Sequence, residues 1–165
     1  MPEIFVSIGS NVDRDHHIPQ ALRDLETRFG PLNVSSIYES QAVGFEGDAF
    51  YNLVVSFDSG LPAQDIARML SEIEALHGRT RESKKFAPRT LDLDLILYGD
   101  LILTQGKLIL PREELTEYAF MLEPLAEIAP DRKHPVLGEG FGDLWAAYDK
   151  TKANQRRIVP PWSLS

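Results

Sequence analysis

The order of elements along the chain predicts an α+β fold, a ferredoxin-like split βαβ sandwich with helices on one face of an antiparallel sheet. Some segments show the short apolar runs typical of strands, and others carry apolar residues every three or four positions, as helices do. The predicted order is strand, helix, strand, strand, helix, strand, followed by a helical C-terminal extension. We therefore expect the uncovered face of the sheet and its loops to carry a site.

Three strands and one helix are predicted in the first part of the chain. The apolar segment Ile4–Ile8 predicts a buried strand because the turn-forming residues Gly9-Ser10-Asn11 follow it. An amphipathic helix ending at Gly30 is predicted next. Its apolar residues, three or four positions apart, are Ile18, Leu22, Leu25 and Phe29. Asn33–Val43 and Tyr51–Asp58 are strand-like and flank a glycine-bearing loop.

A second helix is predicted to begin near Pro62 and to end before Gly78. Its core stripe consists of Ile66, Met69, Leu70, Ile73 and Leu76. The later predicted elements are a strand at Leu91–Tyr98, short extended pieces at Leu101–Leu103 and Leu108–Leu110, and helices at Tyr118–Ile128 and Gly142–Tyr148. We expect residues 1–165 to form one domain, with a peripheral tail from Lys150 to Ser165 that contains two consecutive prolines.

Composition limits the classes of function. A chain of 165 residues with 43% hydrophobic residues is large enough to bury a core as a soluble domain. The net charge of −8 argues against general binding to nucleic acid. The absence of cysteine excludes disulfides and thiolate chemistry. No apolar run approaches the roughly 18 residues that span a bilayer, and no signal-peptide pattern opens the chain, so we expect a cytoplasmic protein without membrane partners.

Positive charge is concentrated between Gly78 and Leu91, in contrast to the acidic balance of the whole chain. The cationic residues there are Arg79, Arg81, Lys84, Lys85 and Arg89, with Glu82 as the single acidic residue among them. Arginine binds phosphate oxygens through paired, charge-assisted hydrogen bonds. The segment therefore predicts contact with a polyphosphate.

Two carboxylates follow directly, at positions that share one face of a strand. Asp92 and Asp94 are two residues apart, so their side chains point the same way, about 7 Å apart, while the leucines at 91, 93, 95 and 97 form the opposite face. Aspartate is a poor strand former, and two such carboxylates repel each other unless a cation joins them. Mg²⁺ suits this arrangement. The alternatives are a solvated strand face or salt bridges to the nearby arginines.

The segment KKFAPRTLDLDLIL resembles the signature of the 6-hydroxymethyl-7,8-dihydropterin pyrophosphokinase (HPPK) family. The residues that fit this signature are Lys85, Ala87, Pro88, Arg89, Asp92 and Asp94. The resemblance extends from Ser7–Asn11 through Tyr51-Asn52-Leu53 to Phe120-Met121-Leu122 and Glu127–Pro130. It implies a ferredoxin-like monomer that transfers the β,γ-pyrophosphoryl group of ATP to the hydroxymethyl oxygen of a pterin in folate synthesis.

The resemblance also implies roles for individual residues. Asp92 and Asp94 are similar to the ligands of two Mg²⁺ ions, and Asp92 also lines the pterin pocket. The implied ATP contacts are Glu74, Arg79, Arg81 and Arg89, the three arginines also being catalytic. The other implied pterin residues are Ser40, Val43, Phe50, Asn52, Phe86 and Phe120, with Asn52 on the pterin edge and Phe50 and Phe120 on its two faces. Without the resemblance, Phe50 and Phe120 are explained by core packing and Glu74 by a solvent-facing position.

The chain departs from the family pattern at three positions. Arg112 and Glu113 follow Pro111, where the family carries a histidine and a tyrosine near the ATP. Tyr118 stands where an arginine usually precedes the second stacking aromatic. We expect Arg112 to supply cationic charge to the ATP, since a guanidinium is always protonated and binds phosphate. The departures leave two other hypotheses open, a diverged paralogue with weak or altered activity and a noncatalytic nucleotide- or pterin-binding module.

Overall fold

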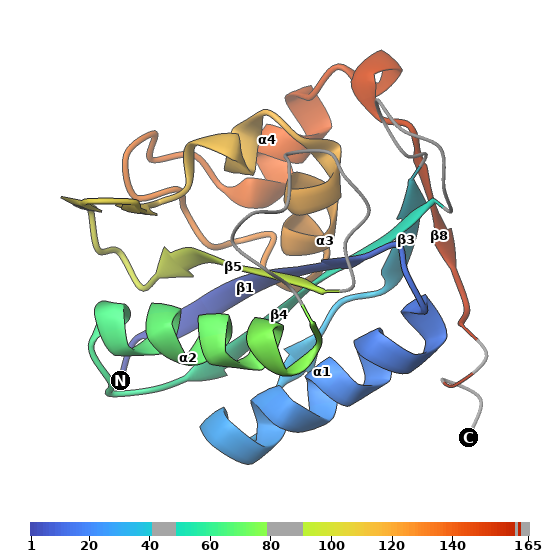
Figure 1. The fold of residues 1–165 in the computed structure, drawn as a ribbon. Coiled ribbons are helices and arrows are strands. Elements are labelled where there is room, and N and C mark those ends of the chain that lie inside the picture. The colour runs from blue at the N-terminus through green and yellow to red at the C-terminus, as the bar shows by residue number, and fades with distance from the viewer. Residues whose placement is uncertain (41–48, 79–90, 161, 163–165) are drawn as a thin grey trace.

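The computed structural model describes residues 1–40, 49–78, 91–160 and 162. Its main sheet is antiparallel, with the strand order β5-β1-β4-β3-β8 and with β2 pairing to β4, while β6 and β7 form a separate hairpin (Figure 1). The strands are β1 (Glu3–Ser10), β2 (Asn33–Val34), β3 (Ile37–Ser40), β4 (Phe50–Asp58), β5 (Asp92–Tyr98), β6 (Leu103–Gln105), β7 (Leu108–Leu110) and β8 (Gln155–Ile158). The helices are α1 (Arg14–Phe29), α2 (Ala63–Leu76), α3 (Ala119–Ile128) and α4 (Phe141–Ala147), with short 3-10 turns η1 (Glu113–Thr116) and η2 (Lys150–Lys152). The predicted α+β class and antiparallel sheet are confirmed.

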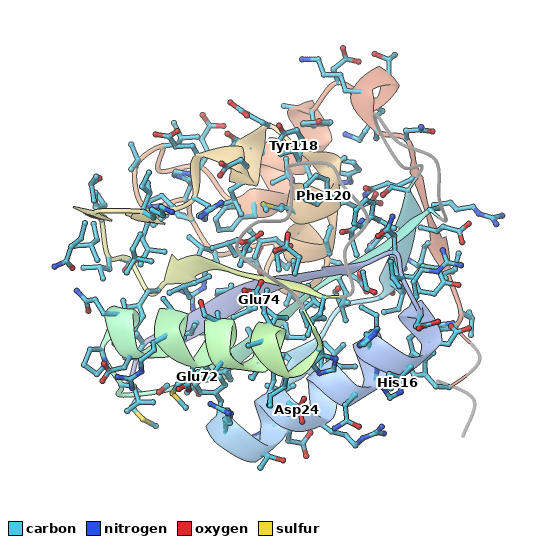
Figure 2. The ribbon with its side chains drawn as sticks, in the orientation of Figure 1. His16, Asp24, Glu72, Glu74, Tyr118 and Phe120 are labelled. Atoms are coloured by element: carbon cyan, nitrogen blue, oxygen red, sulfur yellow. The ribbon has the colours of Figure 1, made fainter. Side chains whose placement is uncertain are left out.

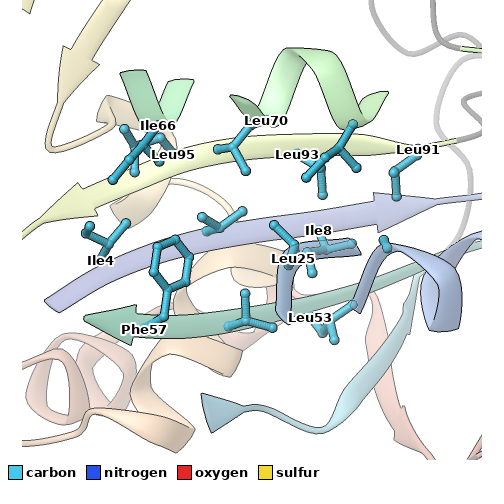
Figure 3. Close-up of a cluster of buried hydrophobic side chains, with 14 of the residues drawn as sticks. Ile4, Ile8, Leu25, Leu53, Phe57, Ile66, Leu70, Leu91, Leu93 and Leu95 are labelled. Carbon is cyan, nitrogen blue, oxygen red and sulfur yellow. The ribbon is translucent and has the colours of Figure 1, made fainter. Parts of the chain in front are cut away.

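Helices cover both faces of the sheet rather than one. The face toward α1 and α2 carries a core cluster that includes Ile8, Leu53 and Leu93 (Figure 3). The opposite face packs against α3 and α4 through a second cluster that includes Phe5 and Ile96. The predicted helical extension therefore forms a second helical layer. On the face that we expected to be uncovered, Asp92 and Asp94 are half-buried and are not part of this second cluster.

Both predicted N-terminal helices are present close to their expected positions. α1 buries Ile18, Ala21 and Leu25, and it ends where Gly30 adopts a φ of 89° while donating its N–H to the Glu26 carbonyl at 2.9 Å. This left-handed conformation suits glycine, which explains why the helix ends there. α2 starts directly after Pro62.

The strand predicted from Asn33 to Val43 is interrupted. Its described part forms two short strands, β2 and β3, which are separated at Ser35 and Ser36. The Ser35 hydroxyl accepts the Val54 N–H at 2.9 Å, and the Ser36 N–H donates to Glu127 at 3.0 Å. The Ser35 N–H still donates to the Val54 carbonyl at 3.0 Å, but the Ser35 hydroxyl and the Ser36 N–H make bonds outside the strand ladder where the strand is interrupted.

The prediction that Leu97 shares a face with Leu93 and Leu95 is wrong. Between β1 and β5, Val6 pairs with Leu95 but Phe5 pairs with Leu97, so one extra residue lies on β5. This bulge turns Leu97 to the α3 and α4 face, where it packs with Ile96. The alternation predicted for Asp92 and Asp94 precedes the bulge and is preserved.

The C-terminal tail contains an element that sequence analysis did not predict. Gln155–Ile158 form β8, which pairs antiparallel with β3 at the edge of the sheet (Figure 1). The ring of Trp162 lies 6.1 Å from that of Tyr51, measured between centroids. Within the described ranges, no helix has the length and apolarity needed to cross a membrane.

Candidate active site

Three adjacent strands bring an amide and a carboxylate into one row. In the antiparallel registers, Gly9 of β1 is the partner of Asn52 on β4 and of Asp92 on β5. Ser7, two residues earlier, pairs with Asp94. The Cα atoms of Asn52 and Asp92 are thus about two strand spacings, or roughly 10 Å, apart. All of these positions alternate with residues of the α1 and α2 core, so they lie on the opposite face.

Asn52 is held tightly at its end of the row. It is 5% exposed, and its Nδ2 donates to the hydroxyl of Ser40 at 3.1 Å. A Cβ added to Gly9 would lie 2.9 Å from Asn52 Oδ1, closer than non-bonded atoms tolerate. Glycine at position 9 therefore allows the amide to approach the β1 backbone. The structure brings Ser40 and Asn52 together, and their shared role in a pterin pocket stays a prediction.

Asp92 and Asp94 are half-buried on β5 and share one face of the strand. Leu93, between them, points into the core on the opposite side. Its N–H donates to the Glu74 carboxylate at 2.7 Å, and Figure 2 shows Glu74 on α2 beside β5. Glu74 therefore fastens α2 to the start of the strand that carries both aspartates. Its predicted contact with ATP stays a prediction.

The carboxylate pair has the chemistry of a site for a hard cation. Among the described residues, no group of three or more histidine, cysteine or acidic side chains is arranged to hold a metal ion. Mg²⁺ does not need such a group, because it commonly takes one or two carboxylates and completes its shell with substrate phosphates and water. Asp92 and Asp94 fit that mode of binding.

Aromatic side chains lie at the same end of the molecule. Phe50 begins β4 and lies on the same face as Asn52, two residues away. Phe120, near the start of α3, stacks on Tyr118 with 5.1 Å between ring centroids and 21° between planes (Figure 2). Tyr118, which replaces the arginine of the family pattern, is thus occupied as a ring partner of Phe120. A pterin between Phe50 and Phe120 stays a prediction.

Arg112 lies next to β5 but is engaged by a carboxylate. Its main-chain N–H donates to the Ile96 carbonyl at 3.1 Å, which places the residue beside the strand that carries the aspartates. Its Nε pairs with Glu114 Oε2 at 3.2 Å. Contact with ATP would require the guanidinium to exchange this partner or to share it. Val43, Arg79, Arg81, Phe86 and Arg89 lie outside the described residues.

Glu127 anchors α3 to the sheet, a role that sequence analysis missed. Its carboxylate accepts the Tyr38 hydroxyl at 2.7 Å, as well as the Ser36 N–H and hydroxyl. Burial alone would raise the pKa of Glu127, but these hydrogen bonds, with Arg157 nearby, hold it below its usual value. Burial, followed by the bond to Glu127, raises the pKa of Tyr38. Glu127 lies in the segment Glu127–Pro130, which resembles the family, but the sequence of that segment does not reveal which residues Glu127 contacts.

Arg14 is a second residue that the sequence did not single out. Its Nη1 donates to the Ala49 carbonyl at 2.7 Å and lies 3.5 Å from Glu39, while the guanidinium carbon lies 3.9 Å above the Tyr51 ring. Arg14 thus contacts β3 and the start of β4, next to Ser40 and Phe50. A single cation at the first position of a helix carries no periodic signal, so only the structure shows this contact.

Comparison with known proteins matches most of the chain, including the strands that carry the polar row. The family model described as 7,8-dihydro-6-hydroxymethylpterin-pyrophosphokinase matches residues 5–130. The 2-amino-4-hydroxy-6-hydroxymethyldihydropteridine pyrophosphokinase of Aquifex aeolicus is 34% identical over 138 residues, which cover 82% of this chain and 86% of that protein. The protein of the same name from Pseudomonas aeruginosa is 36% identical over 150 residues, covering 87% and 90%.

Some relatives are much longer. The folic acid synthesis protein fol1 of Pneumocystis carinii is 34% identical over 82% of this chain but only 18% of that protein. The HPPK-DHPS structure of Plasmodium falciparum with pteroate shares the fold, with a TM-score of 0.76 and 16% identity, over 95% of this chain and 46% of the other. This chain thus spans about half the length of that structure. The family match covers the row of Asn52, Gly9 and Asp92, and the chain belongs to the HPPK family.

Proposed function

We propose that this chain transfers pyrophosphate from MgATP to 6-hydroxymethyl-7,8-dihydropterin, giving the pterin diphosphate and AMP in folate biosynthesis. The names of the Aquifex and Pseudomonas relatives support the activity. The observation that carries the proposal is the row in which Gly9 pairs with both Asn52 and Asp92. It sets an amide suited to a pterin edge beside carboxylates suited to a cation on phosphate.

The reaction is a direct displacement. The hydroxymethyl oxygen of the pterin forms a bond to the β-phosphorus of ATP, and the bond from that phosphorus to the oxygen retained by AMP breaks. The hydroxyl proton passes to solvent, and no side chain is assigned as its base. Two Mg²⁺ ions, held by Asp92 and Asp94, would neutralise charge on the transferred oxygens when bound. The chain itself contributes positioning and electrostatics.

For the pterin, we propose that Asn52 pairs with the amide edge while Phe50 and Phe120 stack on the two faces. The bond from Asn52 to Ser40 and the close backbone of Gly9 orient the amide before any ligand binds. Each offset stacking contact adds about 0.5–1.5 kcal/mol beyond the burial of area. Val43 and Phe86 complete the proposed pocket.

For the nucleotide, we propose contacts from Glu74, Arg79, Arg81, Arg89 and Arg112. The bond from Leu93 to Glu74 supports a second role for this glutamate, in which it holds the aspartate-bearing strand against α2. The Arg112–Glu114 pair supports an exchange of partners, because a triphosphate carries more negative charge than one carboxylate. We also propose that the chain is a cytoplasmic monomer, that it forms one catalytic domain, and that ATP is its co-substrate.

The test is an assay of AMP formation with and without the pterin, followed by phosphorus NMR of the pterin product. Pterin-dependent AMP with a pterin diphosphate supports the proposal. Turnover that is slow here and faster with another hydroxymethyl compound would favour the diverged paralogue, which the pairing of Arg112 and the stacking of Tyr118 make the second candidate. Binding of both ligands without AMP would identify a noncatalytic module.

A further inference from the structure

The strand β8 joins two parts of the site that are far apart in the sequence. It lies outside the residues that the family model matches, which end at residue 130. Its main chain pairs with β3, and Figure 1 shows it along the outer edge of the sheet on that side. In this register Gln155 is the partner of Ser40, the residue that holds Asn52.

The side chain of Gln155 reaches the other part. Its Nε2 donates to the carbonyl of Ala119 at 3.1 Å and to Glu123 Oε1 at 2.9 Å. Ala119 is the first residue of α3 and directly precedes Phe120. One residue thus binds β3 through its backbone and the start of α3 through its amide.

The next residue on the same face of β8 strengthens this link. Arg157 Nη2 donates to the Tyr38 hydroxyl at 3.2 Å and lies 3.9 Å from Glu127 on α3. Arg156, between them, instead pairs with Glu39 at 3.1 Å, and its side chain is 77% exposed. The contacts to Tyr38 and α3 therefore come from alternate residues of β8, as a single strand face requires.

We propose that Gln155 is a positioning residue for the pterin pocket, setting the separation between β3 at Ser40 and the start of α3 at Phe120. This inference rests on the proposed function, in which Asn52 and Phe120 both contact the pterin. A ring held between an edge-binding amide and a stacking face needs these two groups at a fixed spacing. Gln155 does not touch the substrate, and it acts through Ser40 and Ala119.

The experiment compares Gln155→Met, Gln155→Ala and Gln155→Glu with Arg156→Ala as the matched control. Gln155→Met keeps side-chain length and removes the donor, while Gln155→Glu also places a carboxylate beside Glu123. Main-chain pairing holds β8 in every variant, so circular dichroism should show an unchanged fold. Arg156→Ala removes an exposed ion pair from the same strand and should leave the kinetics as in the wild type.

We expect KM for the pterin to rise about tenfold in Gln155→Met and further in Gln155→Glu, with KM for ATP unchanged within twofold. A merely structural role would not separate the two constants in this way. Equal changes in both KM values, changes in neither, or loss of folding in Gln155→Met would overturn the inference. AMP formation by the wild type tests the proposed function separately, so an active wild type with unaffected variants contradicts the positioning role alone.

Discussion

The two faces of the central strands differ in what they contribute. Toward α1 and α2, every second residue is apolar and buried, as at Ile8, Leu53 and Leu93. Toward α3, the neighbours of those residues at the end of the sheet are Gly9, Asn52 and the two aspartates of β5. The same three strands thus build a continuous core on one side, and on the other side a polar row at one end of the sheet, beside the second apolar cluster.

This difference separates stability from function. Aspartate and glycine weaken strands, and a buried amide has to be satisfied by partners such as Ser40. Such residues add little to folding, so their presence on this face is best explained by the chemistry that we propose for them. Burial of the apolar face supplies the stability that these residues do not. Substitutions in the polar row should therefore lower activity without lowering stability, and substitutions on the apolar face should do the reverse.

The largest effect is expected at the carboxylates. Asp92→Asn and Asp94→Asn each should lower the rate of AMP formation by at least about 100-fold, because charge needed at the transferred phosphates is lost. Thermal stability should be unchanged or higher, since one charge of a repulsive pair is removed. Asp100→Asn, at an exposed turn after the same strand, is the control and should stay active. Rates within tenfold of the wild type for both site variants would disprove the two-metal assignment.

The opposite result, a loss of stability with substrate affinity preserved, is expected at Leu93, which lies between the two aspartates. Leu93→Ala should lower the free energy of unfolding by about 2–5 kcal/mol, because it opens a cavity between β5 and α2. Denaturant unfolding measures this, and Val34→Ala at an exposed position should cost less than about 0.5 kcal/mol. At a temperature where the variant is folded, KM for both substrates should be preserved. A normal stability with a raised KM would mean that the faces are not functionally separate.

The division between the faces was predictable at β5, but its limits were not. Strict alternation of leucine and aspartate predicts the faces from residue 91 to residue 95, because strand side chains have a period of two. The bulge that turns Leu97 depends on the pairing with β1, which no local pattern encodes. The strand QRRI of β8 is short and mostly polar, so only its pairing with β3 makes it a strand.

The arrangement of the candidate residues could be predicted in part where a motif contains them. The alternation at Asp92 and Asp94 predicted a shared strand face, which the structure shows. The resemblance assigned Ser40 and Asn52 to one pterin pocket; the structure shows the two residues hydrogen-bonded, and the pocket itself stays a prediction. The roles of Glu127 and Gln155 depend on partners 89 and 36 residues away in the chain. A single sequence contains no periodic or compositional trace of such contacts, which arise only when the layers pack.

A smaller effect is expected from Gly9→Ala, which disturbs the polar row without changing its charges. The new Cβ would displace the Asn52 amide, so KM for the pterin should rise by roughly five- to 150-fold, or about 1–3 kcal/mol. In the Asn52→Ala background the same substitution meets no amide oxygen and should add little. A double-mutant cycle measures this coupling. Strictly additive effects would show that Gly9 and Asn52 act independently.

The smallest effect concerns pH and belongs to the helical layer on the apolar side. His17 Nδ1 lies 2.7 Å from His77 Nδ1, and His77 Nε2 lies 3.1 Å from Asp24 Oδ2, which joins α1 to the end of α2. Burial, then repulsion from His77 and His16, holds the pKa of His17 below its usual 6.5, against a weaker opposing effect of Asp13. Figure 2 shows His16 and Asp24 along the same helix.

The sign of the effect follows from the lowered pKa of His17. Between that value and about 6.5, the unfolded chain binds a proton that the folded chain resists, so stability falls as the pH drops through this window. Burial also lowers the pKa of His134, which adds a loss of the same sign. His17→Gln retains the His134 contribution, so the decrease in Tm between pH 7.5 and pH 5.5 should become smaller without vanishing. KM for the pterin, which depends on the opposite face, should be the same in both proteins at pH 7.5. An identical Tm decrease in both proteins would show that proton uptake by His17 is not coupled to folding.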